Sequence, residues 1–116
     1  MDDSILTSVK KLLGIEETYE HFDADIIIHI NSVLATLWQL GVGSEEGFSI
    51  QDKSSKWSDF LGTDVLLNLV PTYVYLKVRL AFDPPTVGGV LEAMQREADR
   101  YEWRINIAAE RNTTES

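Results

Sequence analysis

The chain has 116 residues, no cysteine and a formal net charge of −9 at pH 7, because 19 acidic side chains face 10 basic ones. This length fits one domain, the lack of cysteine excludes a disulfide framework and a thiolate zinc site, and the acidic balance argues against a protein that grips nucleic-acid phosphates. No apolar run approaches the roughly 20 residues of a membrane span, so we expect no membrane-spanning segment. A signal peptide begins with basic residues, whereas this chain begins with acidic ones, so we expect no signal peptide.

Residues 4–13 form the first predicted helix. Asp3 or Ser4 can cap its start, and Gly14 is placed to end it. Its apolar residues recur at helical spacing, which predicts one buried face. They are Ile5, Leu6, Val9, Leu12 and Leu13.

The second predicted helix covers residues 24–40, with Asp23 as its cap and Gly41 as its stop. Its apolar stripe is broader than one face of a surface helix, which indicates packing on more than one side. The residues of the stripe are Ile26, Ile27, Ile30, Val33, Leu34, Leu37, Trp38 and Leu40.

Residues 41–63 interrupt the helical pattern with four glycines and five serines, so they predict a long loop. Within it, Phe48 and Ile50 can form a short extended piece, and residues 57–61 a single helical turn. A loop of this length in a compact domain is usually functional or mobile.

Residues 64–82 predict the third and most buried helix, because two adjacent apolar rows run along it. Pro71 lies inside this range and removes a backbone donor, so we expect a kink near Val70. The sequence Asp83-Pro84-Pro85 ends the helix. The two rows are Leu66, Leu69, Tyr73, Leu76 and Leu80, and Leu67, Val70, Val74, Val78 and Ala81.

The fourth predicted helix spans residues 87–109, and residues 110–116 are expected to be a flexible polar tail. A heptad-like seam runs along this helix: Val87, Leu91, Met94, Ala98, Tyr101, Ile105 and Ala108. The sequence thus predicts an all-α fold. It is a single domain over residues 1–116, a small bundle of about four helices with a long 41–63 loop and an extended C-terminal helix.

Residues that could carry catalysis or bind a metal do not gather into a recognisable set. Asp25 and His29 have the spacing of a metal pair, but no third ligand stands at a recognisable distance, and the polar side of a helix explains both. No glycine-rich phosphate loop or nucleophile motif is present. We therefore predict no enzyme activity, no catalytic residue, no metal and no cofactor.

The last helix carries an unusual pair opposite its seam. Trp103 and Ile107 lie four residues apart, two arginines precede them on the same side, and a third adjoins. Aromatic and arginine side chains are enriched at the centres of protein interfaces, so we predict an interface here. The alternative is that Trp103 packs on the 41–63 loop of its own chain. Trp57 likewise either pins that loop to the core or contacts a neighbour. The candidate interface residues are Trp57, Phe60, Arg96, Arg100, Trp103, Arg104 and Ile107.

Five stretches cover most of the chain and carry a resemblance to a known family: LLGI, HINSVLATLWQLGVG, KWSDFLG, VPTYVYLKVRLAFDPPT and VLEAMQREADRYEWRIN. Together they resemble the small head–tail connector proteins of tailed bacteriophages, also called adaptor or head-completion proteins. The pair Gly88-Gly89 departs from the helix formers expected at that point.

The resemblance implies a structural protein of the virion neck with no enzymatic role, made in the host cytoplasm. It implies a ring of about twelve copies with cyclic symmetry beneath the portal protein, extending the DNA channel towards a stopper or tail-completion protein. DNA would pass through without sequence-specific binding, and no membrane would be involved.

Two other classes of function remain open from the residues. One is a small acidic regulator that binds and inhibits a DNA-binding protein as a DNA mimic; the other is a helical enzyme subunit whose catalytic partners lie elsewhere. A DNA mimic needs paired rows of acids, whereas here the acids cluster near the N-terminus and alternate with arginines in the last helix. The acidity itself fits either solubility or a surface along which DNA slides.

Overall fold

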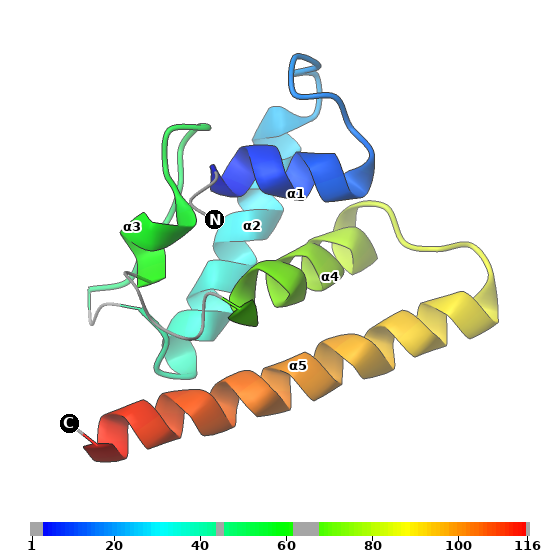
Figure 1. Ribbon diagram of the computed structural model, residues 1–116. Coiled ribbons are helices and arrows are strands. Elements are labelled where there is room, and N and C mark those ends of the chain that lie inside the picture. Colours follow the sequence, from blue (N-terminus) through cyan, green and yellow to red (C-terminus); the bar gives the residue numbers. More distant parts are fainter. Residues whose placement is uncertain (1–3, 44–45, 62–67, 116) are drawn as a thin grey trace.

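A computed structural model describes residues 4–43, 46–61 and 68–115, with the backbone alone described for residues 111–115. The described ranges contain five helices, and their one β-type pairing is the isolated bridge between Ser4 and Lys56 (Figure 1). The predicted all-α fold is confirmed. None of the helices in these ranges combines the length and apolar character that a membrane span requires.

Helix α1 (Ile5–Leu13) begins and ends where the sequence predicts. The Ser4 hydroxyl accepts the Thr7 N–H at 3.2 Å, which satisfies one of the free donors of the first turn. Gly14 ends the helix with a φ of 83°, a left-handed conformation that suits a residue without a side chain.

Helix α2 (Asp23–Gln39) matches its predicted range within one residue, but the prediction that Asp23 caps it is wrong. Phe22 precedes the helix without a side-chain cap, and Asp23 is the first helical residue. The Asp23 carboxylate pairs instead with the ammonium of Lys10 at 2.8 Å. This partner on α1 is distant in the sequence and takes the side chain away from the helix end.

The segment between α2 and α3 (Trp57–Leu61) follows the predicted loop with a single helical turn. The side chain of Asn31 holds its middle, because its amide donates to the Ile50 carbonyl (3.0 Å) and its oxygen accepts the Ile50 N–H (2.7 Å). The Ile5 N–H donates to the Ser55 carbonyl at 2.9 Å and ties the end of the segment to α1.

Helix α4 (Val70–Phe82) begins later than predicted, and the expected kink near Val70 is wrong. Pro71 lies in the first turn, where a residue without an N–H costs no hydrogen bond, so it starts the helix rather than bending it. The predicted start at Asp64 lies outside the described residues. Helix α4 is central, since it packs on α1, α2 and α5. Its fully buried residues include Val70, Tyr73, Val74 and Val78.

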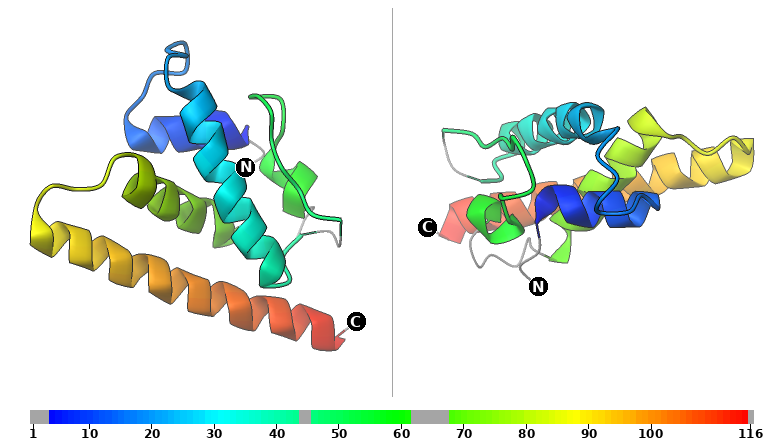
Figure 2. Two further views of the ribbon diagram at one scale, coloured as in Figure 1. Left: turned by 180° about the vertical axis from the view of Figure 1, so that it is seen from behind. Right: turned by 90° about the horizontal axis from the view of Figure 1, so that it is seen from above.

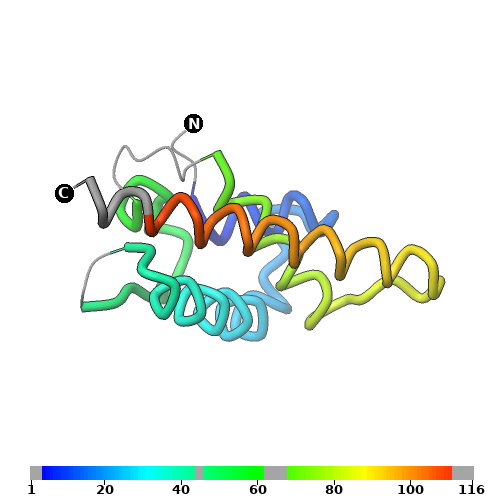
Figure 3. Tube along the Cα trace, turned by 90° about the horizontal axis from the view of Figure 1, so that it is seen from below, coloured from blue at the N-terminus to red at the C-terminus, as the bar shows by residue number. Residues whose placement is uncertain are grey.

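Helix α5 (Gly88–Glu115) packs chiefly on α4 and runs along one side of the molecule, its first turns extending past the other helices (Figures 1 and 3). The Val87 carbonyl accepts the Leu91 N–H, so the helix starts at the glycine that follows. The predicted end at Ala109 is wrong, because neither glycine nor proline follows to stop the helix. The flexibility of residues 110–116 stays a prediction.

Candidate interaction surface

One row of side chains on α5 faces away from the core. Ala93, Arg96, Arg100, Trp103 and Ile107 follow one another at steps of three and four residues, and we call this row the outer face of α5. Trp103 is 65% exposed and Ile107 43%. The opposite side of the helix is buried at Ala98, Ile105 and Ala109. At this exposure Trp103 does not pack into the described part of the 41–63 loop.

The arginines of α5 have different surroundings. Arg100 pairs with Glu97 at 2.9 Å across one turn, and both side chains are exposed. The Arg104 guanidinium lies 5.4 Å from the centre of the Tyr101 ring, on the flank of the helix. Arg96 has no ion pair among the described residues. Arg96 is exposed and lies two helical turns before Trp103 on the same face of the helix.

Trp57 and Phe60, two further candidate interface residues, belong to the core instead. Their exposed fractions are 3% and 6%. The Trp57 indole N–H donates to the Ser8 hydroxyl at 2.9 Å, so this side chain joins α3 to α1. The Phe60 ring packs on Phe48, with 5.2 Å between ring centres. Both residues are excluded from the candidate surface because a partner could not touch them without opening the core.

The seam of α5 is confirmed in part. Ala98 and Ile105 are buried, and Leu91, Met94, Tyr101 and Ala108 are half-buried. Val87, the predicted first member, precedes the helix and is 63% exposed. The Tyr73 hydroxyl donates to the Glu102 carboxylate at 2.6 Å and adds a polar link between α4 and α5. Burial and this carboxylate raise the pKa of Tyr73.

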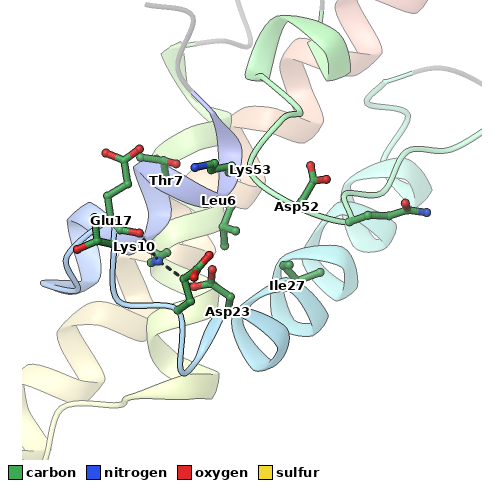
Figure 4. Close-up of a pocket in the computed structure, with 11 residues that line it drawn as sticks. Leu6, Thr7, Lys10, Glu17, Asp23, Ile27, Asp52 and Lys53 are labelled. Carbon is green, nitrogen blue, oxygen red and sulfur yellow. Dashed lines mark hydrogen bonds and ion pairs between the residues drawn. The ribbon is translucent and has the colours of Figure 1, made fainter.

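A cleft of about 490 Å³ lies between α1, the α1–α2 loop, the start of α2 and the segment around Asp52 (Figure 4). Leu6 and Ile27 supply apolar walls. Four carboxylates line the cleft against two lysines, one of which is already neutralised by its ion pair with Asp23. The remaining charged residues are Glu17, Glu20, Asp52 and Lys53, and we call this site the acidic cleft.

Lys10 fixes the wall of the acidic cleft. Its side chain is only 2% exposed, and its ammonium donates to the carbonyls of Glu17 (3.0 Å) and Tyr19 (2.8 Å) and pairs with Asp23 (2.8 Å). Two hydrogen bonds and an ion pair thus surround the ammonium group, which offsets the cost of burying the charge. The sequence contains a sign of this role, since Lys10 stands four residues after Leu6 on the buried face of α1.

Asp52, on the other side of the acidic cleft, accepts hydrogen bonds from the N–H and the hydroxyl of Ser54. These bonds favour the carboxylate, and they lower the pKa of Asp52.

The two histidines contact aromatic rings. His29 lies 6.2 Å from Phe82 and His21 lies 4.8 Å from Phe22, measured between ring centres. No group of three or more potential metal ligands gathers within the part of the chain that the structure describes. His29 is half-buried beside the Phe82 ring of α4, whereas the sequence places it on the polar side of its helix.

Comparison with known proteins gives a family. The family model for phage connector proteins matches residues 5–112, nearly the whole chain; the match covers α1 to α4 and α5 as far as residue 112. No curated protein and no solved structure matches the chain. A match of this extent places the chain in the family, in agreement with the resemblance seen in its sequence. The chain belongs to the phage connector protein family, a family of structural proteins.

Proposed function

We propose that copies of this chain form a ring beneath the portal at the head–tail junction of a phage virion. The ring joins the head to the tail and extends the channel through which DNA passes. Membership of the phage connector family supports a structural role in the phage. Our proposal adds to this structural role the ring, its position beneath the portal, and the channel for DNA.

The observation that carries the proposal is the outer face of α5. A monomer gains nothing by holding Trp103 at 65% exposure beside Ile107 and two arginines, whereas an interface gains from each of them. The chain exposes 7256 Å² in all. Two ring contacts of about 800 Å² per partner would cover roughly a fifth of that surface, which leaves room for the portal and a stopper or tail-completion protein.

The charge of the chain supports a channel that DNA does not adhere to. Binding to a phosphate backbone depends on lysine and arginine, and the chain carries a net charge of −9. A channel wall that repels phosphates lets DNA slide, whereas tight contacts would hold it back.

Mixing the purified chain with the portal protein of the same phage tests the proposal. Native mass spectrometry and negative-stain microscopy should show closed rings of this chain stacked on the portal. A chain that stays monomeric and ignores the portal would refute the proposal. Tight binding to duplex DNA at ~150 mM salt would refute the channel part of it.

A further inference from the structure

A closed ring of identical subunits needs two dissimilar surfaces on each copy, because each contact is head-to-tail. The outer face of α5 is one such surface, and its complement must lie elsewhere on the same chain. The α1–α2 loop, which forms one wall of the acidic cleft, lies at the opposite end of the molecule from α5 (Figures 1 and 2). This placement lets one copy present the cleft while its own α5 contacts the next copy.

The chemistry of the acidic cleft complements that of the outer face of α5. The cleft offers the half-buried side chain of Ile27 beside three carboxylates and one ammonium group (Figure 4). The carboxylates are those of Glu17, Glu20 and Asp52, and the ammonium group is that of Lys53. The outer face of α5 offers an indole and an isoleucine beside two arginines. Apolar groups thus have apolar partners, and opposite charges would meet around them.

The cleft wall is also rigid before any partner arrives. The buried Lys10 ammonium holds two backbone carbonyls of the α1–α2 loop and the first residue of α2. A preformed surface avoids the entropy cost of ordering a loop on binding. The buried lysine therefore both stabilises the loop and prepares the cleft for a partner.

We propose that the acidic cleft of one copy receives the outer face of α5 from the next copy in the ring. Trp103 packs on Ile27 of the cleft, and Arg96 and Arg100 lie beside its carboxylates. The inference rests on the proposed ring and names the surface that completes each contact.

Another exposed surface competes for this role. Ile28 is 66% exposed on α2, and its neighbours along the helix, Ala24, Ser32 and Ala35, are exposed and uncharged. The nearest charge on this surface is Asp25, one helical turn before Ile28, whereas the cleft brings together Glu17, Glu20 and Asp52. Two arginines therefore find more opposite charge in the cleft. The acidic cleft and the surface around Ile28 predict different crosslinks between neighbouring copies.

The absence of cysteine from the sequence allows a direct test with introduced pairs. Ala93→Cys on the outer face of α5 and Thr18→Cys on the cleft wall replace small, exposed, uncharged residues and keep every charge in place. The two variants are mixed on the portal and treated with a short bismaleimide. The mixture should give a covalent dimer, and each variant alone should give none, because a head-to-tail contact brings unlike sites together.

Two further cysteines serve as controls. Gln95→Cys lies on the flank of α5 beside Lys77 and Leu80 of α4 and should not crosslink to Thr18→Cys. Ser32→Cys on α2 marks the competing surface. A crosslink from Ala93→Cys to Ser32→Cys in place of Thr18→Cys would overturn the cleft proposal and leave the ring intact. If microscopy shows no ring on the portal, the proposed function itself fails.

Discussion

Trp57 and Trp103 both have mainly polar neighbours in the sequence, yet Trp57 lies in the core and Trp103 on the surface. Trp57 is 3% exposed and Trp103 65%. Trp57 sits on the short helix α3, whose approach to α1 is fixed by hydrogen bonds from Ile5 and to Ser8. Trp103 sits on a long helix that is already packed on its opposite side. The difference shows that the burial of an isolated aromatic residue depends on long-range partners.

The comparison also separates two uses of an aromatic side chain. The region of Trp57 holds the monomer together, so changes there should lower stability. The outer face of α5 should matter for contacts between copies, so changes there should leave the monomer unchanged. The variants below range from the largest expected loss of stability to the smallest effect.

Trp57→Ala should lower the free energy of unfolding by about 3–5 kcal/mol, since it leaves a large cavity between α3 and α1. Chemical denaturation followed by circular dichroism measures this. Trp57→Phe is the matched control: it keeps most of the ring and loses the hydrogen bond to Ser8, so it should cost less. If Trp57→Ala unfolds like the parent chain, the core position of Trp57 is wrong.

Lys10→Met should lower the free energy of unfolding by about 2 kcal/mol. The change keeps an unbranched side chain but removes the hydrogen bonds to two loop carbonyls and the ion pair with Asp23; the partial exposure of Asp23 (24%) limits the loss. Lys11→Met, at the exposed neighbouring position, should be close to neutral. Equal melting temperatures for the two variants would contradict the role of Lys10.

Tyr73→Phe should cost about 1 kcal/mol at neutral pH, because it removes the hydrogen bond to Glu102. The effect of Tyr73→Phe on the pH dependence of stability is clearest at alkaline pH. The folded-state pKa of Tyr73 is raised, so its contribution is complete below the unfolded-state value of about 10 and is lost as the pH rises above it. Unfolding curves between neutral pH and alkali should fall less steeply for Tyr73→Phe than for the parent or for the exposed Tyr19→Phe. Parallel curves would contradict the burial of this hydroxyl.

Gly89→Ala, in the first turn of α5, should raise the free energy of unfolding by about 0.5–1 kcal/mol. A methyl group at this position meets no other atom within 4 Å. Gly43→Ala is the opposite case: its φ is 89° and its methyl group would lie 2.7 Å from the Phe60 ring, so it should destabilise. Thermal melts of both variants should move in opposite directions, and a common direction would contradict these backbone positions.

The sequence predicts the helices well where their ends are local. Ser4 and Gly14 bound α1 because a cap needs only its neighbours, and the apolar stripe of α2 required no knowledge of the fold. The predicted kink at Pro71 is wrong because the apolar rows run past this residue on both sides, and only the structure shows that α4 starts there.

Part of the candidate site was also predictable. The outer face of α5 follows from helical spacing, which puts Trp103 and Ile107 opposite the seam. The acidic cleft does not, because it combines α1, the α1–α2 loop and the segment near Asp52, which come together only in the folded chain. The burial of Trp57 and Phe60 is not predictable for the same reason: their partners, Ser8 and Phe48, are not adjacent to them in the sequence.

Trp103→Ala tests the central claim most directly, since it separates assembly from folding at one residue. The account predicts a change in the free energy of unfolding of less than about 0.5 kcal/mol, together with the loss of rings on the portal in negative-stain images. Unchanged rings, or a monomer that unfolds, would contradict it.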